Sequence, residues 1–151
     1  MNVFLGIACI IICSYMGVIF SDKFTARNCF YNDFMNFNTK MKSVTSFSHQ
    51  SISEIVNELD DSDFKKCVVS VFGETEFCKL RYLSSEEQDF VKEYLNFIGK
   101  SDSVTQLSYL NSVESEIKNL YNKASEEYKK YRNLYIKLGF LVGLIIFVVL
   151  L

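Results

Sequence analysis

Two long apolar segments stand at the ends of this 151-residue chain and limit what it can fold into. The first, Asn2 to Phe20, contains no charged residue, and the second, Leu134 to Leu151, contains only Lys137. Roughly 20 apolar residues in a helix span the hydrocarbon core of a bilayer. A chain of this size cannot cover two such helices on all sides with its own side chains. The sequence therefore predicts membrane-spanning helices over residues 1–20 and 134–151.

A secretory signal peptide is the alternative interpretation of the first segment. Such a peptide needs a basic stretch before the apolar run and small residues at a cleavage site. Neither pattern is present around Asn2 to Phe20. We therefore expect the first segment to be retained as a membrane anchor.

Basic residues flank the apolar segments on one side only. They follow the first segment and precede or begin the second, as Lys23, Arg27, Lys129, Lys130, Arg132 and Lys137. Because cytoplasmic flanks carry the excess of Lys and Arg, we expect a two-pass protein with a cytoplasmic central domain and both termini outside. The same side chains could contact anionic lipid headgroups, or they could serve only as a topology signal on a solvated face.

The central residues 21–133 show helical periodicity, and the chain has no proline to interrupt a helix. One aromatic-rich stripe continues from the first apolar segment, as Phe30, Phe34, Phe37, Met41, Val44 and Phe47. Further stripes lie within residues 52–59, 64–72, 77–83, 90–98 and 104–134, and the last continues into the second apolar segment. We predict an all-α fold, an antiparallel bundle of about five to six helices, in which these stripes form the core.

Helix ends are indicated by capping patterns. Ser51 with Glu54, and Ser84 with Glu87, have capping-box spacing. Gly73 and Gly99 are expected to end helices. The last helix is expected to begin near Ser101 or Ser103 and to continue unbroken to the end of the chain.

No catalytic, cofactor or metal signature is apparent. The five cysteines lack metal-ligand spacing, so we expect reduced, mostly buried thiols. His49 has no partner ligand nearby, and Asp60, Asp61 and Asp63 are explained better by helix capping than by a metal loop. A net charge of -2 argues against nucleic-acid binding. We expect a non-enzymatic interaction protein without a small-molecule substrate.

Two short motifs carry a family resemblance. Ile98-Gly99-Lys100-Ser101-Asp102, followed by Gln106, resembles an LG-x-SD-x-x-x-Q turn, and Tyr131 to Leu144 is similar to a KYxxLYxxLGxLxGL tail. With Leu5-Gly6, these motifs resemble the stage III sporulation protein AB family over the whole layout of the chain. The sequence departs from the family pattern in having Ser51-Ile52-Ser53-Glu54 instead of a proline-containing helix start, and Thr105 instead of glycine.

The resemblance implies a function that periodicity does not. It implies a mother-cell membrane protein of the channel that links mother cell and forespore in endospore-forming bacteria. It also implies similarity to the inner-membrane platform of type II secretion, with other channel proteins, including the cytoplasmic ATPase, as partners. Gly99, Ser101, Asp102 and Gln106 form a candidate docking turn, for which helix capping is the simpler role. The alternative function is a small membrane-anchored regulator or adaptor unrelated to sporulation.

Overall fold

The computed structural model describes residues 2–47, 52–73, 75–98, 100 and 102–150, and the described residues form five α-helices without strands. In chain order these are α1 (Asn2–Phe47), α2 (Ile52–Asn57), α3 (Asp63–Phe72), α4 (Ser85–Phe97) and α5 (Ser103–Leu150). The predicted all-α fold and its two long apolar terminal helices are confirmed. The predicted continuity of the last helix is also confirmed, because α5 has no break between Ser103 and Leu150.

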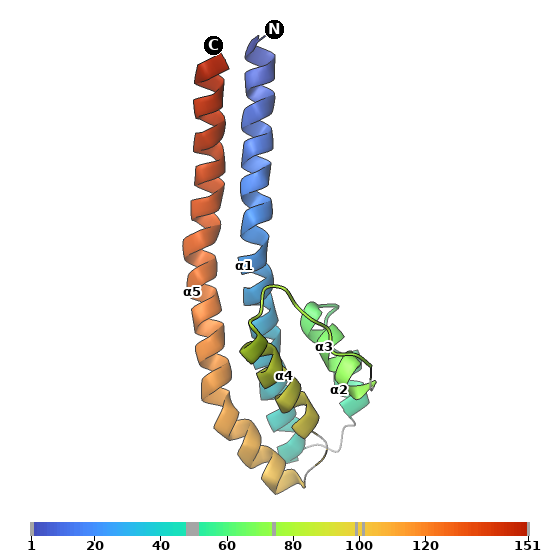
Figure 1. Cartoon of the computed structure of the whole chain (residues 1–151). Helices are drawn as coiled ribbons and strands as arrows, with labels where there is room; N and C mark the ends of the chain where they lie inside the picture. The colour runs from blue at the N-terminus through green and yellow to red at the C-terminus, as the bar shows by residue number, and fades with distance from the viewer. Residues whose placement is uncertain (1, 48–51, 74, 99, 101, 151) are drawn as a thin grey trace. The chain divides into compact units, whose positions relative to one another are not determined.

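The chain forms two compact units, and both long helices contribute to each. One unit, which we call the hairpin unit, contains residues 1–28 and 122–151. The other, which we call the core unit, contains residues 29–121. In the hairpin unit α1 and α5 lie side by side and run antiparallel, so the two termini lie at the same end (Figure 1).

The core unit is built around aromatic side chains of α1. Phe30, Phe34 and Phe37 are at most 2% exposed, as the stripe predicted. The ring of Phe64 from α3 lies against all three, with centroid distances of 5.3–5.5 Å. Tyr94 from α4 packs edge-on against Phe34 at 4.7 Å. Aromatic contacts of this kind add to the free energy of area burial and fix the positions of α3 and α4 on α1.

A buried polar contact crosses the same core. The hydroxyl of Tyr94 donates a hydrogen bond to Asn38 Oδ1 at 3.0 Å, and the side-chain amide of Asn38 donates to the Leu110 carbonyl at 3.5 Å. Burial raises the pKa of Tyr94 well above its ordinary value, so the hydroxyl stays protonated and can donate. This contact connects α1, α4 and α5 at one level of the core.

Residues 75–84 correct the expectation of helix throughout the central region. They form an irregular segment with a turn, although Leu80 and Leu83 are buried as predicted. The Gln88 side-chain amide donates to the carbonyls of both leucines, at 3.2 and 3.0 Å. The segment can therefore stay non-helical because its backbone acceptors are satisfied by a side chain.

The predicted helix ends agree with the structure where they are described. Ser84 and Glu87 form the expected capping box at the start of α4. Gly73 is the C-cap of α3, and its N–H donates to the carbonyls of Val69 and Val71. The caps expected at Ser51 and Gly99 lie outside the described residues.

Substitution of the central aromatic ring tests this core. Phe64→Ala removes a fully buried side chain and should lower the free energy of unfolding by about 3–5 kcal/mol. The matched control is Phe72→Ala on the same helix, where the ring is 38% exposed and the loss should be clearly smaller. A denaturant titration of the full chain in detergent measures both, and equal losses would contradict the proposed core.

Candidate functional site

The hairpin unit brings the two terminal apolar segments into direct backbone contact. Three glycines lie at the contact, namely Gly17 in α1 and Gly139 and Gly143 in α5. A Cβ atom added to Gly17 would lie 2.6 Å from the Tyr135 carbonyl oxygen, and one added to Gly139 would lie 2.6 Å from the Cys13 carbonyl oxygen. Neither distance is sterically allowed without a backbone shift, so glycine is required for this helix separation.

The spacing of Gly139 and Gly143 is the signal for this contact in the sequence. Small residues four apart in an apolar helix commonly form a close helix–helix interface. Both apolar segments and their side-by-side arrangement were expected from the sequence, but the glycine contact between them was not. A Cβ added to Gly143 would lie 2.8 Å from the Ile10 Cα, so the contact extends along the helix pair.

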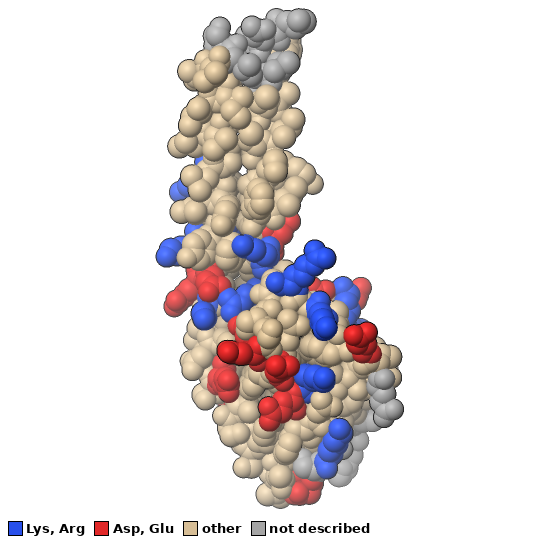
Figure 2. All heavy atoms as spheres, in the orientation of Figure 1, with Lys and Arg blue, Asp and Glu red and all other residues tan. Residues whose placement is uncertain are grey.

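The outer surface of the helix pair is apolar and exposed. Only 11% and 6% of the most apolar windows of the two long helices are buried, whereas a core helix of a soluble protein would be mostly buried. On the face drawn in Figure 2, the described residues of the upper part of the helix pair are neither acidic nor basic. Both helices are long and apolar enough to cross a membrane. Exposed side chains on this surface include Phe4, Ile11, Phe140, Ile145 and Val149.

Two of the predicted basic residues are engaged in contacts within the hairpin unit. Arg27 forms an ion pair with Glu127, and its side chain is only 13% exposed. Arg132 donates a hydrogen bond to the Tyr128 hydroxyl at 2.6 Å and lies over the same ring at 5.3 Å. Partly buried pairs such as the first one fix α1 against α5 more firmly than fully solvated pairs do. No partner for Arg27 was predicted from the sequence.

Lys23 and Lys130 flank an aromatic stack. Phe24 stacks on Tyr131 with ring centroids 5.0 Å apart, and also on Tyr135 at 5.9 Å. The Lys23 ammonium lies 4.9 Å from the Phe24 centroid, and the Lys130 ammonium lies 5.2 Å from the Tyr131 centroid. These distances are typical of cation–π contacts, which leave the ammonium N–H donors available.

The remaining predicted basic residues, Lys129 and Lys137, are exposed. The hairpin unit therefore holds all six predicted basic residues, and all of them except the half-buried Arg27 are exposed.

The candidate docking turn is described only in part, because Gly99 and Ser101 lie outside the described residues. Asp102 is the N-cap of α5: its carboxylate accepts a hydrogen bond from the Thr105 N–H at 3.1 Å. Gln106 is 8% exposed, and its side-chain amide donates to Thr45 Oγ1 at 3.0 Å. Asp102 thus caps α5, and Gln106 connects the start of α5 to the end of α1. The capping role is the simpler of the two expected for this turn.

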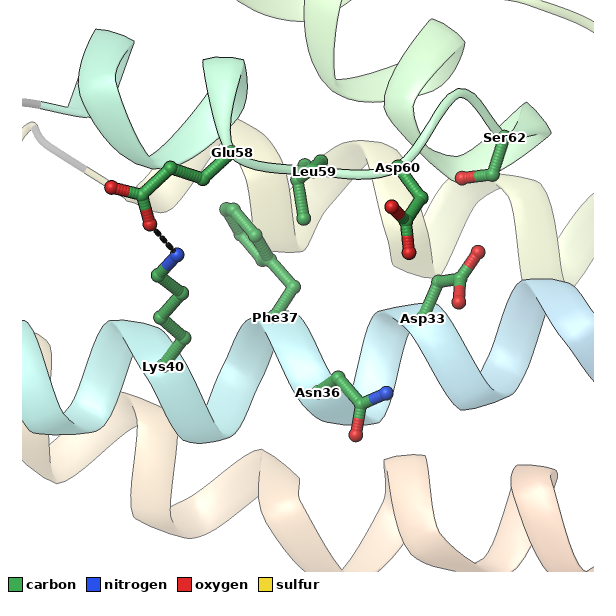
Figure 3. A pocket seen from close by; sticks show the side chains of 8 residues that line it. All are labelled: Asp33, Asn36, Phe37, Lys40, Glu58, Leu59, Asp60 and Ser62. Carbon is green, nitrogen blue, oxygen red and sulfur yellow. Dashed lines mark hydrogen bonds and ion pairs between the residues drawn. The ribbon is translucent and has the colours of Figure 1, made fainter.

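A polar pocket of about 180 Å³ opens between α1 and the segment that joins α2 to α3 (Figure 3). At one end Lys40 pairs with Glu58, and at the other the carboxylates of Asp33 and Asp60 point toward each other. The buried ring of Phe37 forms its floor. Within the residues that the structure describes, no group of three His, Cys, Asp or Glu side chains could hold a metal ion.

The capping role expected of Asp60, Asp61 and Asp63 is filled by Ser62, which lies within the acidic run, and Asp63 lies in the first turn of α3. Ser62 is the N-cap of α3 and accepts from the Lys65 N–H at 3.3 Å. Asp63 accepts hydrogen bonds from Lys66 and Tyr82, both at 2.8 Å. The hydrogen bond from Lys66, and to a smaller extent the one from Tyr82, holds the pKa of Asp63 below its ordinary value.

The cysteines differ in exposure. Cys67 is fully buried, Cys9, Cys13 and Cys78 are half-buried, and Cys29 is exposed, so the expectation of mostly buried thiols was wrong. Burial raises the pKa of the Cys67 thiol to about 12, which leaves almost no thiolate at neutral pH.

His49 lies outside the described residues.

The role of Asp102 can be tested through its pH dependence. Hydrogen bonds from the Thr105 side chain and backbone hold the pKa of Asp102 below its ordinary value of 3.8. Its stabilising effect is therefore present above that value and is lost as pH falls through the lower folded-state pKa. Asp102→Ala should lower Tm at neutral pH, and the difference from wild type should shrink in acid.

Circular dichroism melts of the full chain in detergent provide the measurement. Asp102→Asn is the control and should keep most of the wild-type Tm, because asparagine caps helices as well as aspartate does. An unchanged Tm in Asp102→Ala, together with a loss of sporulation, would assign the turn to partner docking instead.

The matched region of a known family can now be placed on this geometry. The profile of the family described as stage III sporulation protein AB matches residues 60–151, well over half of the chain. No curated protein and no solved structure matches the chain. The matched residues include α3, α4 and the whole of α5, with both Asp102 and the close-contact glycines of that helix. The chain belongs to the stage III sporulation protein AB family.

Proposed function

We propose that this protein is a non-enzymatic membrane component of the channel that links mother cell and forespore during endospore formation. Family membership carries this proposal. It is supported by the two long apolar helices, which would hold the protein in the mother-cell membrane around the forespore.

In the proposed arrangement residues 1–20 and 134–151 cross the membrane. The region 21–133 lies in the cytoplasm, and both termini lie outside. The one-sided basic residues support this orientation, since no Lys or Arg precedes Lys23 or follows Lys137. The antiparallel pairing of α1 and α5 in the hairpin unit is compatible with a two-pass anchor.

The central domain would serve as a platform for partners, as in the platform proteins of type II secretion. Its partners would be the cytoplasmic ATPase of the channel and neighbouring membrane subunits. The aromatic core and the Asn38–Tyr94 contact support this role, because a stable core unit can present its outer helix faces in fixed positions. Val69 and Phe72 on α3, 50% and 38% exposed, are apolar side chains available on such a face.

The proposed orientation predicts the behaviour of reporter fusions. Alkaline phosphatase, which is active only outside the cytoplasm, should be active after residue 151 and inactive when inserted near Asn57. Green fluorescent protein should show the reverse pattern at the same two positions. A C-terminal fusion that is fluorescent and lacks phosphatase activity would overturn the orientation.

The proposed role predicts a stage-specific phenotype. Deletion of the gene in its endospore-forming host should stop sporulation after engulfment, and expression from a mother-cell promoter alone should restore it. Pull-down of the tagged full chain from sporulating cells should recover the channel ATPase, with a tagged unrelated two-pass protein as control. Expression during vegetative growth and normal sporulation of the deletion strain would favour the adaptor alternative.

A further inference from the structure

The glycine contact leaves a hollow on the apolar surface of the hairpin unit. Gly17 and Gly139 have no side chains, while larger side chains stand around them on both helices. The result is an open groove of about 220 Å³, lined by Cys13, Met16, Phe20, Tyr135, Leu138 and Val142 besides the two glycines. Because this lining is almost wholly apolar, water is a poor occupant, and an apolar chain would gain dispersion contacts there.

Aromatic contacts connect one end of the groove to two lysines. Tyr135 lines the groove and stacks on Phe24, which is the first ring of the aromatic stack described above. Through this stack the groove is connected by direct contacts to the ammonium groups of Lys23 and Lys130. The two lysines stand three residues after the first proposed span and four residues before the second, about one helical turn in each case.

The hairpin unit as a whole is basic, although the full chain is slightly acidic. Its residues 1–28 and 122–151 contain seven Lys or Arg and three Asp or Glu, a net charge of +4. One of the three acidic side chains, Glu127, is already paired with Arg27. An anionic group is therefore favoured beside the groove, while the groove itself favours a hydrocarbon chain.

We propose that the groove and the two lysines form a binding site for an anionic phospholipid. One acyl chain would lie in the groove, and the phosphate would accept hydrogen bonds from the ammonium groups of Lys23 and Lys130. A phospholipid satisfies both features because its charge and its hydrocarbon chain lie next to each other, as they do here. A neighbouring transmembrane helix would fill the groove but would leave the positive charge without a partner.

This proposal rests on the membrane spans proposed above, and the experiment separates the two. The full chain is reconstituted into lipid nanodiscs that contain either phosphatidylglycerol or phosphatidylcholine with a photoactivatable acyl chain. After illumination, mass spectrometry locates the lipid adducts. We expect adducts at residues 13–20 and 135–142, about 25-fold more abundant with phosphatidylglycerol than with phosphatidylcholine if each lysine contributes about fivefold.

Charge variants test the contribution of the two lysines. Each ammonium should contribute about fivefold to the preference for the anionic lipid. Lys23→Gln with Lys130→Gln should therefore reduce phosphatidylglycerol adducts to the phosphatidylcholine level. Lys129→Gln with Lys137→Gln removes the same charge from exposed lysines and should leave the adducts in the groove. Lys23→Arg with Lys130→Arg keeps both positive charges and should keep the preference for phosphatidylglycerol. Adducts in the groove of this variant would show that the helix pair forms when both lysines are replaced.

Three results would overturn the site. Equal adducts with both lipids would show that the groove does not select a charge. An equal loss in the control pair would show general attraction of the membrane surface instead of a site. Adducts absent from both apolar segments with either lipid would show that the chain does not span the membrane, and would overturn the proposed spans as well.

Discussion

The structure depends on a change of hydrophobic pattern along each of its two long helices. In the core unit α1 is apolar on one face, where Phe30, Phe34 and Phe37 are buried. In the hairpin unit the same helix is apolar nearly all round, and side chains such as Ile11 and Ile19 are more than half exposed. A one-sided stripe needs protein to cover it, whereas a surface that is apolar all round needs lipid. The two units thus differ in whether protein covers the apolar surface of the same two helices.

In the hairpin unit, glycine residues determine how closely α1 and α5 approach each other. Between two helices in lipid there is little hydrophobic gain from pairing, so close packing and hydrogen bonding must supply the attraction. Gly17 and Gly139 allow the backbones to touch. The Arg27–Glu127 pair and the Phe24 stack stand in the same unit, beyond the apolar stretch, and add polar and aromatic contacts between α1 and α5.

Much of the fold could be predicted from the sequence because its signals are local. The spacing of the α1 aromatic residues, the Ser84–Glu87 capping box and the unbroken course of α5 all depend on residues within a few turns of one another. Residues 75–84 were mispredicted because Leu80 and Leu83 have helical spacing. Their backbone carbonyls are satisfied instead by the Gln88 side chain, a contact that periodicity does not reveal.

The candidate sites were less predictable from the sequence, because they depend more on contacts between residues that are far apart in the chain. All six basic residues were found from their place beside the apolar segments, but the ion pair of Arg27 was not, because its partner Glu127 is 100 residues away in the sequence. The capping role of Asp102 was predictable because Thr105 is three residues away. The Thr45 partner of Gln106 was not, because it comes from another helix.

The family match covers α5 but not α1. The close contact of α5 nevertheless depends on residues of α1. Gly139 in the matched helix approaches the α1 backbone at Cys13 and Gly17, and Gly17 has no side chain that would prevent this approach. Both helices also contribute to the groove and to the two lysines beside the aromatic stack. Lys130 lies in the matched region, and Lys23 lies outside it. The lipid site is therefore a property of the helix pair, and neither helix contains it alone.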